Sequence, residues 1–199
     1  MNALRKTRIK TMMKYTWPFY IISVVVVGML LSFIFSVTHQ LPGYKQLTIF
    51  VSGEVVDGSK FKSDLLEKYQ DNELKSVTYI DAKLDNSNYN TKLTIAGYNT
   101  ADILIIPVSK LESIDVASFG LELNDELTAN YYQGYNFFFE DSVKYGVKVD
   151  KEKVKQYMNL PNEDCYMILS GKSENVGEYA KAKKKERNNA LNVVKDWGM

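Results

Sequence analysis

Cysteine and histidine are almost absent from this sequence, and their scarcity excludes several classes of protein. The 199 residues include one cysteine, Cys165, and one histidine, His39. A single cysteine can form no internal disulfide, so the chain is not a disulfide scaffold and its stability must come from a hydrophobic core. Clusters of His and Cys that could bind zinc are also missing, and we therefore expect no metal site.

The residue patterns of common enzymes are missing too. His39 lies beside a long apolar segment, so a Ser-His-Asp or Cys-His constellation would need it to reach a separate domain. Cys165 begins an apolar run, which favours buried packing over a nucleophilic role. Ser52-Gly53-Glu54 lacks the glycines with which a phosphate-binding loop surrounds its ligand. We expect no catalytic residue, no cofactor and no enzymatic activity.

Charge is balanced overall but unevenly distributed. Lys and Arg number 25 against 24 Asp and Glu, a formal net charge of +1. The segment 1–16 holds five basic residues and no acidic one, so the rest of the chain is mildly acidic. This balance argues against nucleic acid as a partner.

The basic head precedes a long uncharged apolar run, 17–37. A helix over such a run spans about 30 Å, the thickness of the hydrocarbon core of a bilayer. The run ends in bulky residues without a small-residue cleavage site, which favours an uncleaved anchor over a signal peptide. A buried core helix is the alternative, although such a helix rarely stays apolar on every face for so long.

The distribution of charge around this run predicts how the chain lies across a membrane. Basic residues ahead of a spanning helix favour a cytoplasmic N-terminus. We therefore expect a single-pass protein of the cell membrane whose contact with the lipid bilayer is made by 17–37. Its parts are a basic cytoplasmic segment (1–16), a transmembrane helix (17–37), a tether (38–45) and an extracytoplasmic α/β domain (46–199).

Strand and helix patterns alternate along the rest of the chain, 46–199. Strands are predicted over 46–53, 75–84 and 100–109, and helices over 57–70, from Asn88 to Gly97 and from Ser109 to Phe119. Such βαβ units predict a parallel sheet. A later strand over 165–171 and a C-terminal helix that presents Ala190, Leu191, Val194 and Trp197 on one face complete the domain.

Two segments have two interpretations each. The aromatic stretch 129–150 predicts a hairpin or an extended crossover, and its Tyr and Phe side chains serve either core packing or a recognition surface. The basic run 181–187 is either the solvated face of a helix or a contact with a partner or an anionic surface.

Several segments together resemble a known family. The pattern of Phe61 to Tyr69, Tyr89 to Leu93 and Ala101 to Pro107 is similar to the opening of extracellular solute-binding proteins of ABC importers. Tyr145-Gly146-Val147 resembles a later segment of the family, with Lys148 in place of its proline, and Ile168 to Asn175 resembles a late helix opening. The resemblance implies one lobe of a periplasmic-binding-protein fold, a three-layer α/β lobe with a mostly parallel sheet.

The chain departs from that family where the second lobe should be inserted. The segment that separates Val149 from Cys165 is too short for a domain. The expected function is therefore a non-enzymatic, membrane-tethered module that resembles one lobe of a solute-binding protein. It would act as a subunit or accessory of a membrane complex, most plausibly a transporter, with a membrane protein as partner. A tethered small-molecule sensor or binder is the alternative.

A surviving site is expected at the carboxyl ends of the strands, where open α/β sheets bind ligands. Ser109 and Ser173 can also be explained as helix N-caps. The candidate ligand- or partner-binding residues are Ser52, Gly53 and Glu54 after the first strand, Pro107 and Ser109 after the third, and Gly171, Lys172 and Ser173 after the late strand.

The predicted orientation can be tested with a protease added to spheroplasts. We expect digestion of the region after residue 45, while a tag at Met1 stays protected, because the basic residues hold the N-terminus in the cytoplasm. Immunoblots against tags at both ends measure this. Protection of the C-terminal tag would show the opposite orientation.

Overall fold

The computed structural model describes residues 2–38, 41–179 and 187–199. The chain divides into two compact units, an N-terminal helix and a domain that begins at Pro42. Each unit is described by itself.

The first unit is the helix α1 (Asn2–Thr38), which extends from the basic head through the apolar run. Its segment Tyr15–Phe35 has a mean hydropathy of 2.4 and no residue buried within the structure. The hydroxyl of Ser23 donates a hydrogen bond to the carbonyl oxygen of Phe19, which satisfies a polar group inside the apolar segment. The prediction of a helix long and apolar enough to cross a membrane is confirmed.

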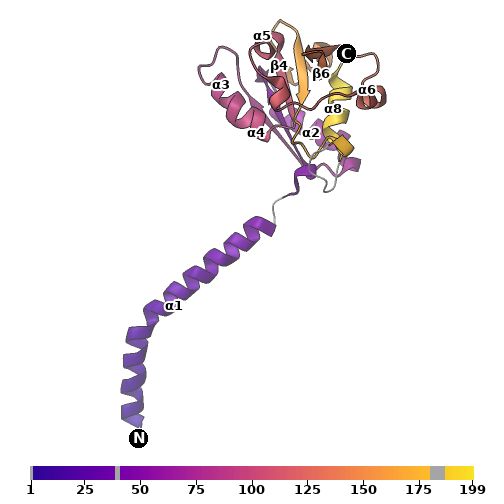
Figure 1. Cartoon of the computed structure of the whole chain (residues 1–199). Helices are drawn as coiled ribbons and strands as arrows, with labels where there is room; N and C mark the ends of the chain where they lie inside the picture. Colours follow the sequence, from indigo (N-terminus) through magenta and orange to yellow (C-terminus); the bar gives the residue numbers. More distant parts are fainter. Residues whose placement is uncertain (1, 39–40, 180–186) are drawn as a thin grey trace. The chain divides into compact units, whose positions relative to one another are not determined.

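In the second unit, the described residues form a mixed six-stranded sheet (Figure 1). The strands lie in the order β3-β1-β4-β8-β6-β5. Their bounds are β1 (Gln46–Val51), β3 (Ser76–Asp81), β4 (Ile103–Pro107), β5 (Phe137–Glu140), β6 (Val143–Lys148) and β8 (Cys165–Leu169). A separate ribbon pairs β2 (Glu54–Val55) with β7 (Met158–Asn159).

The mostly parallel sheet expected from the sequence is only partly present. β1 runs parallel to β3 and β4, but β8 is antiparallel to both of its neighbours, β4 and β6, and β5 is antiparallel to β6. The apolar sequence of β8 could not reveal this direction, because a strand buried on both faces looks the same whichever way it runs. The α/β class is confirmed, and the sheet is mixed.

Helices cover both faces of the sheet, which gives three layers. One core contains Leu47 and Ile49 of β1, and it extends to the helices α2 and α8. The other contains Phe50 of β1, and it extends to α3 and α5. Figure 1 shows α3 and α4 on one side of the sheet and α8 on the other. The alternation of side chains along β1 thus supplies apolar groups to both cores.

The helices of this unit are short. The α-helices are α2 (Gly58–Lys68), α3 (Tyr89–Lys92), α4 (Tyr98–Thr100), α5 (Val108–Leu111), α6 (Asp125–Tyr131), α7 (Lys151–Val154) and α8 (Asn189–Trp197). A π-helical turn, η3 (Leu93–Gly97), joins α3 to α4, and the 3-10 turns are η1 (Gly43–Lys45), η2 (Gln70–Asn72), η4 (Val116–Ser118) and η5 (Gly177–Tyr179).

Several sequence-based helix ends are wrong. The helix predicted from Ser109 to Phe119 is only α5, which ends at Leu111. Gly97 does not stop its helix, which continues as α4 to Thr100. A Cβ at Gly97 would lie 3.0 Å from Leu93 and 3.3 Å from Leu104, so the glycine allows the helix to approach β4. The Asn88 side chain makes no capping hydrogen bond to α3.

The aromatic stretch forms a hairpin, as one of the two interpretations predicted. Strands β5 and β6 are joined by Asp141 and Ser142, whose φ angles of 48° and 68° suit a two-residue hairpin turn. Tyr132 is fully buried, whereas Phe139 remains 54% exposed. Core packing therefore explains part of this stretch. The basic run 181–187 lies outside the described residues except for Arg187.

The end of the predicted tether belongs to the domain. Tyr44 of η1 is buried, and the side-chain amide of Asn175 donates to the carbonyl oxygen of Gly43 at 3.3 Å. The domain therefore begins near Pro42, ahead of the predicted boundary at residue 46. Pattern reasoning places Pro42 and Gly43 in a linker and gives no indication of the long-range contact of Gly43.

The buried Tyr132 hydroxyl offers a test of this packing. It donates to the carbonyl oxygen of Leu191 in α8 at 3.1 Å. Replacement of Tyr132 by Phe should lower the free energy of unfolding by about 1 kcal/mol, because the buried hydrogen bond between the ring and α8 is lost. Urea unfolding of the detergent-solubilised chain measures this. Tyr166→Phe, which removes a hydroxyl from a half-buried ring, is the control and should change stability less.

Candidate functional site

The residues predicted to form one site lie at two opposite edges of the sheet. We call the edge at which β1 and β4 end the carboxyl edge, and the edge at which they begin the amino edge. Ser52, Gly53 and Glu54 follow β1, and Pro107 and Ser109 lie at the end of β4, so these five residues lie at the carboxyl edge, as predicted. β8 pairs antiparallel with β4, with Cys165 opposite Pro107 and Leu169 opposite Ile103.

The direction of β8 carries the remaining candidates away from that edge. Gly171, Lys172 and Ser173 follow β8 and therefore lie beside the start of β4, at the amino edge. The expectation that all eight residues meet at one edge is wrong, because it assumed that the late strand ran parallel to the others.

The carboxyl edge is covered by the short connection that stands where the second lobe was expected. We call residues 150–164 the edge cover; they include α7 and β7. β7 pairs with β2, and the backbone N–H of Val56 donates to the carbonyl oxygen of Tyr157 at 2.9 Å. The N–H of Val108 donates to the carbonyl oxygen of Asp164 at 2.9 Å. These bonds fasten the cover to the segments that follow β1 and β4.

Beneath the cover, two of the predicted site residues are structural. Ser52 is fully buried, and its hydroxyl shares a 2.7 Å hydrogen bond with that of Tyr89. Burial raises the pKa of Tyr89. A Cβ at Gly53 would lie 2.4 Å from the carbonyl oxygen of Asn159, so only glycine allows β7 to approach this closely.

The other carboxyl-edge candidates have partners of their own. Pro107 is buried within β4. Ser109 does not cap a helix: its N–H and hydroxyl donate to the carboxylate of Glu163 at 3.0 and 2.8 Å. Glu54 forms a 2.8 Å ion pair with Lys83, and both side chains are about half exposed. This edge also carries a shallow hollow of about 350 Å³ lined by Gly53, Glu54, Lys83, Leu84, Asp85, Asn159, Leu160 and Pro161.

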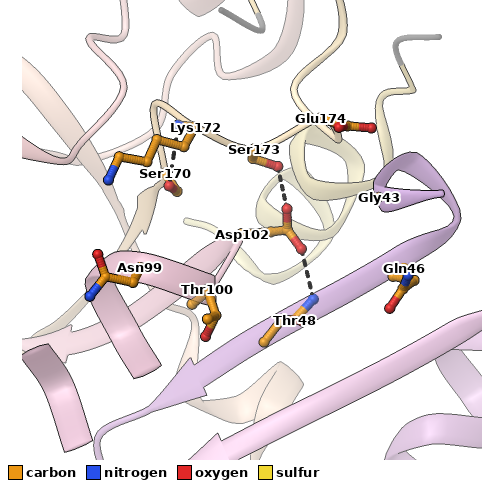
Figure 2. A pocket seen from close by; sticks show the side chains of 11 residues that line it. Gly43, Gln46, Thr48, Asn99, Thr100, Asp102, Ser170, Lys172, Ser173 and Glu174 are labelled. Atoms are coloured by element: carbon orange, nitrogen blue, oxygen red, sulfur yellow. Dashed lines mark hydrogen bonds between the residues drawn. The ribbon is translucent and has the colours of Figure 1, made fainter. Parts of the chain in front are cut away.

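A second pocket lies at the amino edge, where the sequence predicted none. We call it the amino-edge pocket; its volume is about 250 Å³. Figure 2 shows Asp102 at its centre, between the start of β1 and the loop that follows β8. Its lining consists of Gly43, Gln46, Thr48, Asn99, Thr100, Ala101, Asp102, Ser170, Lys172, Ser173 and Glu174.

Asp102 holds this edge together through its side chain. Its carboxylate accepts hydrogen bonds from the N–H of Thr48 at 2.8 Å and from the hydroxyl of Ser173. Figure 2 draws both bonds as dashed lines. The hydroxyl of Ser173 also accepts from the N–H of Asn175 at 3.0 Å, so Ser173 organises the loop and caps no described helix. Burial raises the pKa of the Asp102 carboxyl group, and these hydrogen bonds oppose that effect.

The polar network continues from Asp102 into the C-terminal helix. The side-chain amide of Asn175 donates to the carbonyl oxygen of Gln46 at 2.7 Å. The amide of Asn189, in α8, donates to the side-chain oxygen of Asn175 at 3.1 Å and to the carbonyl oxygen of Tyr44 at 3.3 Å. The network therefore joins β4, the loop after β8, α8 and the start of the domain.

Two further observations concern metal ligands and the single thiol. Within residues 2–38, 41–179 and 187–199, no group of three or more His, Cys, Asp or Glu side chains could hold a metal ion. The thiol of Cys165 is buried, and burial raises its pKa to about 11, so it stays protonated at neutral pH.

Sequence reasoning missed Asp102, although one signal for it exists. The residue stands directly before the buried strand β4, at a position where an unpaired carboxylate is costly. Its partners come from β1 and from the loop after β8, which are 54 and 71 residues away in the sequence. Their proximity follows from the sheet order, which the sequence did not reveal.

Comparisons with family models, curated proteins and solved structures yield no match to this chain. The resemblance to solute-binding proteins therefore rests on the quoted sequence segments alone.

Asp102 should make the stability of the domain depend on pH. Because its pKa is higher in the folded than in the unfolded chain, the folded state binds more protons between the two values. Stability should therefore decline as pH rises from about 4 through the folded pKa. Asp102→Asn should remove this part of the decline. It should also cost about 1–3 kcal/mol at neutral pH, because an amide cannot accept from both Thr48 and Ser173 as the carboxylate does.

Urea unfolding of both proteins at a series of pH values checks this. Asp85→Asn, a change at an exposed carboxylate of the carboxyl edge, is the control and should retain the decline. A pH profile of Asp102→Asn identical to that of the parent would contradict the assignment.

Cys165 should behave as a buried packing group. Cys165→Ser should lower the free energy of unfolding by about 1–2 kcal/mol, because the hydroxyl replaces a thiol in an apolar setting. Membrane localisation and partner recovery should stay unchanged. Alkylation by iodoacetamide, followed by mass spectrometry, should be slow for the folded chain and fast in urea. Loss of partner recovery in a folded Cys165→Ser variant would show that the thiol has another role.

Proposed function

We propose that this chain is a non-enzymatic, membrane-tethered module whose α/β domain lies outside the cytoplasm. In this proposal α1 anchors the chain, and the domain contacts a membrane protein as a subunit or accessory of a membrane transport complex. The apolar segment Tyr15–Phe35 supports the anchor. The basic residues ahead of it support a cytoplasmic N-terminus.

The observation that carries the proposal is the edge cover. A small molecule at the carboxyl edge would need the strand ends to be accessible, but Ser52 is buried there and Ser109 is bound to Glu163. The hollow that remains is shallow and offers a small ligand little of the enclosure on which such sites depend. It suits the side chains of a protein partner better than a solute.

The surface around this hollow has the mixed character of a protein interface. Leu84 and Leu160 line it beside the ion pair of Glu54 and Lys83. Val56, which follows β2, is 60% exposed. Apolar side chains surrounded by charged groups are typical of such contacts. Anchoring in the same bilayer raises the effective concentration of the domain near a membrane partner, so a small contact area can suffice.

A matched pair of substitutions tests this surface. Val56→Arg places a charge on the proposed contact, whereas Ile95→Arg changes a 64% exposed residue of η3. Chemical crosslinking in intact cells, followed by affinity purification, should recover a membrane protein with the parent chain and with Ile95→Arg. Recovery with Val56→Arg should fall about tenfold or more, as for a charge placed in an interface.

Both variants should keep the thermal stability of the parent, because neither side chain is buried. Equal recovery with the two variants would count against the carboxyl-edge surface. Absence of any specific membrane partner of the parent chain would overturn the proposal.

A tethered small-molecule binder is the second candidate. The amino-edge pocket favours it, because this pocket is lined mainly by polar and charged groups and reaches the buried carboxylate of Asp102. That pocket lies at the edge opposite to the proposed protein-contact surface, so the two candidate functions depend on different residues.

A further inference from the structure

We propose that the amino-edge pocket binds a small zwitterion, a molecule that carries both an ammonium group and an anionic oxygen group such as a phosphate or carboxylate. The inference rests on the second candidate function and names the class of its ligand. It concerns Lys172, Glu174 and the groups between them, and it does not involve the carboxyl-edge surface.

The charges in the pocket are of both signs and are not paired with each other. Lys172 is exposed and Glu174 half-buried, and both line the cavity. Among the described residues, neither the Lys172 ammonium nor the Glu174 carboxylate has a salt-bridge partner. Figure 2 shows the two side chains on different sides of Asp102. A ligand with one cationic and one anionic group would match both.

Asp102 adds a second negative charge at the base of the pocket. Its carboxylate is held in place by Thr48 and Ser173, and burial disfavours its ionised form. A cation close to Glu174 and Asp102 would stabilise that ionised form. The ammonium end of the ligand is therefore assigned to this side, and the anionic end to Lys172.

The neutral groups of the lining suit a polar ligand. The hydroxyl of Ser170 accepts a hydrogen bond from the N–H of Lys172 at 3.3 Å, and its own proton has no acceptor within the described part of the chain. Asn99 and Thr100 are exposed at the rim. The Ser170 hydroxyl and the second N–H of the Asn99 amide can donate hydrogen bonds to an anionic oxygen beside Lys172. The Thr100 hydroxyl already donates to the carbonyl oxygen of Ala96 at 2.5 Å, so it can only accept from the ligand.

Other classes of ligand fit less well. A simple anion would face the carboxylates of Asp102 and Glu174, and a simple cation would face Lys172. An apolar ligand would remove these charges from water without pairing them, which is costly. A volume of about 250 Å³ lies below the range of drug-sized sites, which indicates a ligand of few atoms.

Two sources can supply this chemistry. One is a free metabolite, and the other is the phosphoethanolamine head group of a membrane lipid. Gly43, which lines the pocket, follows the end of α1 by five residues in the sequence. The experiment therefore includes a solution arm and a lipid arm.

In the solution arm, the full chain in detergent is heated with phosphoethanolamine, and its unfolding temperature is recorded. Ethanolamine and inorganic phosphate, each with one of the two charged groups, are the comparison probes. We expect a concentration-dependent rise in unfolding temperature with phosphoethanolamine, since a ligand of the folded state stabilises it, and little or no rise with either comparison probe.

Substitutions identify the pocket in the same assay. Lys172→Met and Glu174→Gln should each weaken the apparent affinity about tenfold or more, as expected for the loss of a charged hydrogen-bond partner. Lys195→Met and Glu67→Gln, changes at exposed residues outside the pocket, are the matched controls and should leave the affinity unchanged.

The lipid arm separates the two sources. The chain is placed in phosphatidylcholine nanodiscs with or without phosphatidylethanolamine, and the titration with phosphoethanolamine is repeated. If the lipid head group occupies the pocket, the titration response should disappear in the discs that contain phosphatidylethanolamine. If the ligand is a free molecule, the response should be equal in both.

Two results would overturn the inference. One is the absence of a response to phosphoethanolamine in detergent and in both kinds of nanodisc. The other is an equal response in the parent and in Lys172→Met. Neither result bears on the recovery of a membrane partner with Val56→Arg, so the failure of this inference and the failure of the proposed function are distinguishable.

Discussion

The antiparallel pairing of β4 with β8 determines how the rest of this domain is arranged. The two strands are in register from Ile103 opposite Leu169 to Pro107 opposite Cys165. β8 therefore begins at the carboxyl edge and ends at the amino edge. The connection before it must lie over the carboxyl edge, and the loop after it reaches the amino edge. The pairing of β4 with β8 is therefore the reason why the carboxyl edge is covered and the amino edge has a pocket.

At the amino edge, hydrogen bonds to the side chain of Asp102 fix the local structure. Its carboxylate accepts from the N–H of Thr48 and the hydroxyl of Ser173, and Asn175 and Asn189 extend the network to α8 and to η1. A buried carboxylate is costly unless it is hydrogen-bonded, and here its donors come from different parts of the chain. The same bonds give the pocket its shape, so stability and the proposed binding of a zwitterion depend on one group.

The two edges support different functions on one small domain. The covered carboxyl edge leaves a shallow, mixed surface suited to a protein partner, and the amino edge has a polar pocket suited to a small ligand. In the two proposals above, the domain contacts a membrane partner at one edge and binds a small zwitterion at the other. This arrangement needs no second lobe and no hinge, and it is compatible with the short connection between Val149 and Cys165.

The sequence by itself determined the local features: the apolar helix, the strands β1, β3, β4 and β8, the amphipathic α8 and the burial of Cys165. These follow from hydrophobic periodicity and run length, which neighbouring residues decide. Tertiary structure alone decided the direction of β8, the partner of Ser109 and the donors of Asp102, because each depends on contacts between residues far apart in the sequence. The positions of the candidate residues directly after predicted strands could be read from the sequence. Only the antiparallel pairing of β4 with β8 showed that Lys172 and Ser173 lie at a different edge of the sheet from Ser52.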